Sequence, residues 1–131
     1  MSTLNMKQTV QGSLPEVIDR VTAAIQKEGF GVLTRIDLHQ KFKEKLGQDV
    51  APVVILGACN PQLALAAYQA NPDVTALLPC NVVVRELAPG QMSVEIVKPS
   101  SMMAMLGEDG LAQLAQQADA RLAAALASLA T

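Results

Sequence analysis

The sequence predicts an α+β fold: a two-layer α/β sandwich in which a mainly antiparallel sheet carries helices on one face. Three observations predict it. Segments with the 3.6-residue period of a helix are interspersed with apolar segments of strand length. Two strand-length segments flank a short loop that contains Pro89-Gly90, which is typical of an antiparallel hairpin. No repeat or low-complexity linker divides residues 1–131, so we expect one domain.

The first third of the chain is expected to form a strand, a helix and a second strand. Residues 5–10 alternate loosely in polarity and predict an opening strand. Ser13 and Glu16 have the spacing of a capping box, in which both side chains accept backbone N–H groups at a helix start. Apolar residues then recur at helical spacing until Gly29 ends the helix. The partly β-branched segment of residues 30–37 predicts a strand.

The middle of the chain predicts a short helix, a central strand and another helix. In residues 38–46 apolar side chains recur at every fourth position, which indicates an amphipathic helix closed by Gly47. Residues 52–58 are continuously apolar, as is typical of a strand inside a sheet. Asn60 and Pro61 then indicate a helix start, because asparagine is a favoured N-cap and proline is favoured at the first helical position.

The last part predicts a hairpin and a long helix. The hairpin strands are residues 81–86 and 91–97, and alternation in the second predicts one face toward the core and one toward water. The final helix, residues 110–128, carries a seam of small and large apolar side chains from Leu111 to Leu129. We expect this seam to pack either on the sheet or on a helix of a partner chain.

Composition argues against several functions. The net charge is -2, whereas binding to nucleic-acid phosphates requires a basic surface. Only Phe30, Phe42 and Tyr68 could stack on bases. No apolar run approaches the roughly 20 residues of a membrane span, and residues 1–10 do not have the pattern of a signal peptide. We expect a cytoplasmic protein that binds neither nucleic acid nor membrane.

Two Cys-Asn steps are the most chemically distinctive feature. Cys59-Asn60 ends the predicted central strand and precedes a helix, whose N-terminus is expected to favour a thiolate and lower the pKa of Cys59 from its usual ~8.5. Cys80-Asn81 begins the next strand, and the two cysteines share a sheet edge only if these strands are antiparallel. Two cysteines form no disulfide framework, so we expect free thiols. All four residues are candidates for ligand binding.

Other residues carry weaker indications of chemistry. His39 is the only histidine that could activate a cysteine, but its lysine-rich surroundings favour a solvent-exposed side chain. Cys59, Cys80 and His39 lack the spacing of a zinc site, and we expect no metal site.

Two further groups of side chains have ordinary explanations. Thioethers suit copper(I), but Met102, Met103 and Met105 are expected to fill gaps in an aromatic-poor core. The lysines at positions 41, 43 and 45 are expected to form a solvated helix face rather than an anion site.

Four pieces of the sequence together resemble the prokaryotic domain-of-unknown-function family numbered three hundred and two. These pieces are LGACNP (56–61), LLPCNVVVRE (77–86), KEGFGVLTRID (27–37) and KEKLG (43–47). The resemblance implies a sandwich like one half of the TATA-box-binding protein, a homodimer and no DNA binding, but it implies no activity. The motif positions are Gly57, Cys59, Asn60, Pro61, Leu78, Pro79, Cys80 and Asn81.

Three functions are compatible with these observations. The first is a cytoplasmic homodimeric binding protein that holds a small ligand, a thiol-reactive species or a metal near Cys59 and Cys80. The second is a cysteine-dependent enzyme or redox protein that uses the Cys59 thiolate, with Cys80 resolving it. The third is a structural or interaction module with buried, inert cysteines, whose functional surface is the seam from Leu111 to Leu129. The sequence identifies no cofactor.

Overall fold

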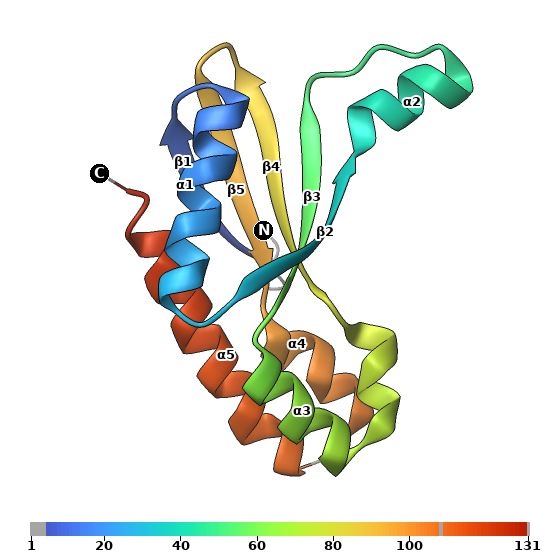
Figure 1. Cartoon of the computed structure of the whole chain (residues 1–131), viewed down its shortest axis with the longest axis vertical. Helices are drawn as coiled ribbons and strands as arrows, with labels where there is room; N and C mark the ends of the chain where they lie inside the picture. The colour runs from blue at the N-terminus through green and yellow to red at the C-terminus, as the bar shows by residue number, and fades with distance from the viewer. Residues whose placement is uncertain (1–4, 108, 131) are drawn as a thin grey trace.

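A five-stranded antiparallel sheet forms the centre of the computed structural model, which describes residues 5–107 and 109–130 (Figure 1). The strand order is β1-β5-β4-β3-β2, and every neighbouring pair is antiparallel. The strands are β1 (Asn5–Gln11), β2 (Gly31–Asp37), β3 (Val53–Cys59), β4 (Cys80–Ala88) and β5 (Gln91–Val97). The predicted α+β fold with an antiparallel sheet is therefore confirmed.

Five α-helices and two 3-10 helices accompany the sheet among the described residues. They are α1 (Leu14–Lys27), α2 (Leu38–Leu46), α3 (Pro61–Ala70), η1 (Pro72–Leu77), α4 (Pro99–Met103), η2 (Ala104–Leu106) and α5 (Asp109–Ala127). The capping box at the start of α1 forms as predicted: Glu16 N donates to Ser13 Oγ over 3.3 Å, and Ser13 N donates to Glu16 Oε1 over 3.2 Å. The short helices α4, η1 and η2 were not predicted.

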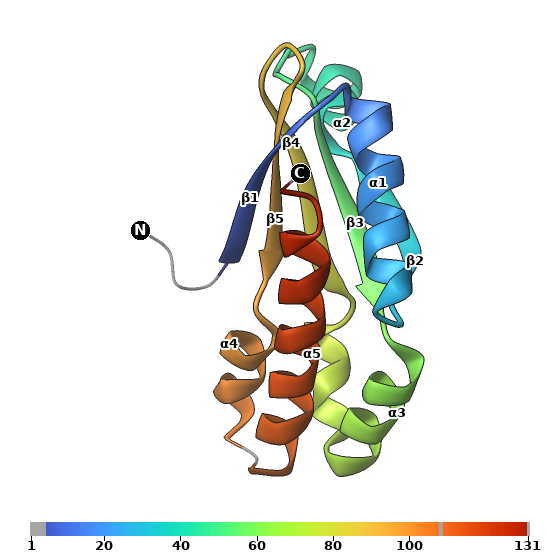
Figure 2. The same ribbon diagram turned by 90° about the vertical axis from the view of Figure 1, so that its left-hand side faces the viewer.

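Helices α1 and α5 cover one face of the sheet (Figure 2). The side chains that alternate toward this face on β3, β4 and β5 are almost completely buried, among them Val54, Leu56, Val82, Val84 and Ile96. They form one hydrophobic cluster with α1 and the second half of α5. A second, smaller cluster joins α3, η1, α4 and the first half of α5, beyond the end of the sheet.

The apolar seam of α5 lies inside the protein. Its members are all buried: Leu111, Ala115, Ala118, Leu122, Ala125 and Leu129. They belong to the two hydrophobic clusters, which α5 connects. The seam packs on the chain's own sheet and helices, which is one of the two arrangements expected from the sequence. The alternative in which this seam is the functional surface for a partner is wrong, because the fold itself covers the seam.

Helix α2 projects away from the body of the molecule (Figure 1). It has no buried residue, and the chain around it exposes Leu33, Leu46 and Val50. The base of the helix is held by His39, whose Nδ1 lies 3.2 Å from the backbone N and 3.1 Å from the backbone O of Val53. The expectation that His39 is solvent-exposed is wrong, because this backbone contact keeps the ring half-buried.

Candidate functional site

The end of β3 and the start of α3 position the first pair of candidate residues. Cys59 is the last residue of β3, and Asn60 is the N-cap of α3, whose Oδ1 accepts the Leu63 N–H over 3.1 Å. Asn60 is only 5% exposed. Its Nδ2 is so near the α1–β2 turn that a Cβ at Gly29 would be 2.9 Å from it, and Gly29 also has a φ of +87°. This turn therefore needs glycine both for its backbone conformation and for the approach of Asn60.

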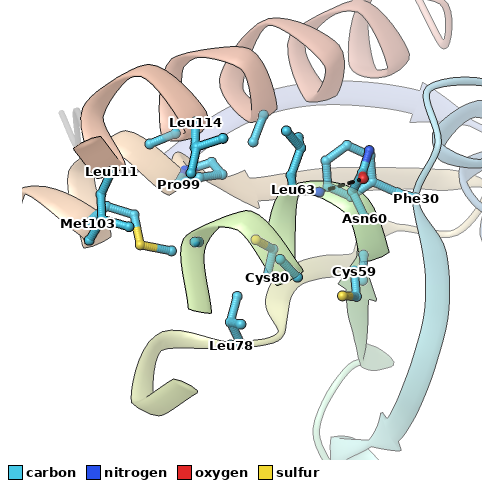
Figure 3. Close-up of a pocket in the computed structure, with 15 residues that line it drawn as sticks. Phe30, Cys59, Asn60, Leu63, Leu78, Cys80, Pro99, Met103, Leu111 and Leu114 are labelled. Carbon is cyan, nitrogen blue, oxygen red and sulfur yellow. Dashed lines mark hydrogen bonds between the residues drawn. The ribbon is translucent and has the colours of Figure 1, made fainter. Parts of the chain in front are cut away.

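The antiparallel pairing of β3 with β4 brings the second cysteine to the same place. Cys80, the first residue of β4, is the register partner of Ala58. Cys59, Asn60 and Cys80 line one narrow pocket of about 40 Å³, which we call the thiol pocket (Figure 3). The condition for the two cysteines to share a sheet edge is thus met.

Apolar side chains form almost all the rest of the thiol pocket. Most of them come from the meeting point of the two hydrophobic clusters, on α3, α4 and α5. Those labelled in Figure 3 are Phe30, Leu63, Leu78, Pro99, Met103, Leu111 and Leu114. Only Phe30 and Leu78 lie in the sequence pieces that resemble the family, so sequence reasoning singled out the two cysteines but not the pocket that these side chains form.

Both thiols are held in their protonated form. Burial raises the pKa of Cys59 above its ordinary value. Burial also raises the pKa of Cys80 to about 11, and the negative charges of Cys59, once it is ionised, and of Asp119 add to the effect. The expectation that the α3 N-terminus lowers the pKa of Cys59 is wrong, because loss of solvation outweighs any favourable interaction with the helix end.

Asp119 is a polar neighbour of this site that the sequence did not indicate. It lies on α5 and accepts hydrogen bonds from the Ser100 backbone N, over 3.0 Å, and from the Ser100 hydroxyl. Both donors belong to the first turn of α4, where backbone N–H groups have no hydrogen-bond partner within the helix. The Asp119 carboxylate therefore connects the start of α4 to α5. This contact fixes the α4 residues Pro99 and Met103 in the pocket wall.

A base and a metal-ligand set are both missing from the thiol pocket. His39 contacts the first residue of β3, whereas Cys59 is the last, which places them about 20 Å apart along the strand. Among the described residues no group of three or more His, Cys, Asp or Glu side chains is arranged to hold a metal ion. Of the three clustered methionines, Met103 is buried in the pocket wall and Met105 is 75% exposed, so the expected gap-filling role holds for Met103 and not for Met105.

Asn81 is separated from the other candidates. Successive residues of a strand point to opposite faces of the sheet, and Asn81 lies on the face away from α1 and α5. There it lines a second depression of about 430 Å³, which we call the groove. The groove is lined by Asn5, Ala76, Leu77, Leu78, Pro79, Asn81, Val83, Glu95, Val97 and Met102. Leu78 lines both depressions, so the LLPCN segment is the wall between them.

Comparison with known proteins places this geometry in a family. The model for "Domain of unknown function DUF302" matches residues 6–129. The chain belongs to the DUF302 family. It is also similar to the crystal structure of an uncharacterized conserved DUF302 protein from Bacillus stearothermophilus, with a TM-score of 0.89 and 32% identity over 98% of this chain and 99% of that chain. No curated protein matches the sequence.

Membership of DUF302 confirms the resemblance that the motifs indicated. The family description assigns no activity, so the function of this DUF302 chain has to be inferred from its site. No helix among the described residues has the length and apolar character needed to cross a membrane.

Proposed function

We propose that the protein binds a small molecule and that the thiol pocket holds an apolar part of this ligand beside Cys59 and Cys80. The observation that carries the proposal is that two cysteines from different strands are among the residues that line one narrow, otherwise apolar pocket. Ligand sites commonly combine an apolar lining with very few polar groups. Here the residues that can supply such groups are Cys59, Asn60 and Cys80.

The size of the thiol pocket limits what it accepts. A volume of about 40 Å³ corresponds to the space of only a few water-sized atoms. The proposal is therefore that the end of a ligand, such as a short alkyl group, enters the pocket. Because both thiols are protonated at neutral pH, they contribute contact surface and weak hydrogen bonds rather than a nucleophile.

The alternative in which Cys59 is a catalytic or redox-active thiolate has less support. A thiolate nucleophile usually lies beside a cation, a base or a metal that lowers its pKa. Cys59 instead has a raised pKa, and the only histidine contacts the opposite end of β3. Ligand binding does not require an ionised thiol.

We propose further that the protein acts in the cytoplasm as a homodimer. Both cysteines are free thiols, which fits a reducing compartment. Half of the large hydrophobic side chains exposed in the described part of the chain lie between residues 33 and 50, which we call the arm: Leu33, Ile36, Leu46 and Val50. A nine-residue helix such as α2 is marginal without tertiary packing, so cover by a second copy would stabilise the arm.

Xenon is a suitable probe for the thiol pocket, because it is apolar and small enough for the volume. Methyl resonances of Leu63, Ala67 and Leu111 should shift saturably with xenon pressure. Ala64→Leu fills the pocket and should abolish these shifts. Ala66→Leu on the same helix is the matched control, because Ala66 does not line the pocket, and it should retain them.

Native mass spectrometry of protein purified without denaturation then tests for a physiological ligand. We expect a bound small mass that the Ala64→Leu variant loses and the Ala66→Leu variant keeps. Equal xenon shifts in both variants, or no shifts at all in the wild-type protein, would contradict the proposed role of the thiol pocket.

A further inference from the structure

The floor of the groove is built from two rows of side chains on the face of the sheet away from α1 and α5. In the first row Asn5 of β1 is the register partner of Val97 of β5, and the β4–β5 register, continued by one residue, places Asn81 on the other side of Val97. In the next row Glu95 of β5 lies between Lys7 and Val83. The first row thus presents two carboxamides and the second a carboxylate.

Glu95 is ionised and firmly held in this floor. Its side chain is only 11% exposed. Although burial opposes the charged form, hydrogen bonds from Arg85 and Ser93 hold the pKa of Glu95 below its ordinary value. Three donors meet at one oxygen, Oε2: Arg85 Nε at 3.1 Å, Arg85 Nη2 at 2.8 Å and Ser93 Oγ at 3.0 Å. This oxygen has little further capacity to accept.

The second oxygen of Glu95 keeps its capacity. Its nearest ionic partner is Lys7 Nζ at 3.9 Å, which is beyond hydrogen-bond distance. Within the described residues no hydrogen bond to Oε1 is formed, and no buried side-chain oxygen or nitrogen lacks a partner. Oε1 is therefore accessible, and the groove is the depression that Glu95 lines. It is a fixed acceptor for a donor group that enters the groove.

The charges around Glu95 select against ions of either sign. An anion in the groove meets the Glu95 carboxylate. A cation meets the positive charges of Lys7 and Arg85, which outnumber the single negative charge of that carboxylate. An uncharged N–H or O–H donor is repelled neither by the carboxylate nor by the two positive charges. The carboxamides of Asn5 and Asn81 can both donate and accept, so they match a group such as an amide or a hydroxyl.

We propose that the groove is a binding site for an uncharged molecule that joins an amide or hydroxyl group to an apolar body. The polar group is bound by Glu95, Asn5 and Asn81, and the apolar body lies against Val83, Val97 and Met102. A volume of about 430 Å³ is within the usual range for small-molecule sites, roughly 300–1,000 Å³. The site shares only Leu78 with the thiol pocket and does not depend on ligand binding there.

Three probes with one ring and different charge test the proposal: benzamide, benzylamine and benzoate. Each is titrated into the full-length protein near pH 7, and the methyl resonances of Val83, Val97 and Met102 are followed. Benzamide should shift all three saturably and bind more tightly than the other two. Equal binding of the three probes, tighter binding of either ion, or the absence of saturable shifts at these methyl groups would overturn the proposal.

A variant at the exposed residue Asn81 tests the polar end without disturbing the core. Asn81→Ala should weaken benzamide binding about 3- to 10-fold, as expected for the loss of one hydrogen bond. Gln62→Ala, at an exposed amide on α3 outside the groove, is the control and should leave the affinity unchanged. An Asn81→Ala variant that binds benzamide as tightly as wild type would overturn the assignment. Xenon binding at the thiol pocket is read from different methyl groups, so the two proposals fail separately.

Discussion

The Cys80 thiol lies among apolar side chains, close enough to Cys59 and Asp119 for their charges to oppose its ionisation. Its pKa of about 11 lies well above the ordinary value for a cysteine thiol. Well below pH 9 the thiol is protonated in the folded and the unfolded protein alike. Between pH 9 and pH 11 the unfolded chain loses this proton first, so Cys80 lowers the stability of the fold as the pH rises.

This effect can be measured against a variant without the thiol. Between pH 8 and pH 10.5 the free energy of unfolding of the wild type should fall by about 2 kcal/mol more than that of Cys80→Ala. Urea denaturation of both proteins at the two pH values gives the difference, in which the titration of other groups cancels. A difference that does not change with pH would mean that the Cys80 pKa is not raised.

Local sequence predicted some properties of the site residues and not others. The N-cap role of Asn60 depends on its neighbours in the chain, and the predicted cap is confirmed. The pKa of Cys59 depends on how much of the thiol is covered by distant segments, and the prediction from the helix end alone was wrong. Glu95 is part of no motif, and its position in the groove follows only from the strand register.

Strand β3 passes so close to its surroundings at Gly57 that only glycine fits. A Cβ at this position would collide with Thr34 Oγ1 on β2 and lie 2.7 Å from Cγ of Pro79, just before β4. Here the requirement is for space, because Gly57 has no positive φ. The close approach brings the LLPCN segment against the strand that ends in Cys59.

Gly57→Ala should therefore destabilise the protein by about 1–3 kcal/mol, the usual cost of overpacking. Thr34→Ala in addition should recover part of the loss, because it removes one of the two collisions. Gly31→Ala on β2 is the matched control, since a Cβ there meets no atom within 4 Å. Chemical denaturation would contradict this account if the Gly57 and Gly31 variants were equally stable.

Elements with a strong internal pattern were predicted well. The bounds of α2 and β5 agree with their sequence patterns, because each has a clear period and a glycine or turn at its end. Helix α4 was missed because its five residues are too few to show a helical period, and contact with Asp119 on α5 helps to hold it. The partner of the α5 seam was left open, since periodicity shows that a face is apolar but not what covers it.

At the scale of the whole molecule, the arm around α2 holds half of the large hydrophobic side chains that are exposed in the described residues. If a second copy covers it, replacing Leu33 and Leu46 by serine should shift the protein from dimer to monomer in light scattering after size exclusion. Both side chains are 68% exposed, so the substitutions should leave the core intact. Met105→Ser, at an exposed position on η2, is the control and should stay dimeric. A wild-type protein that is monomeric at micromolar concentration would contradict the proposed dimer.

The position of Leu78 between the thiol pocket and the groove couples ligand binding in one to ligand binding in the other. The same side chain forms part of the thiol pocket on one side and of the groove on the other. Any occupant that pushes this side chain changes the shape available to an occupant of the other depression. Thermodynamic linkage then requires the influence to be mutual: if benzamide in the groove strengthens or weakens xenon binding by some factor, xenon must alter benzamide binding by the same factor.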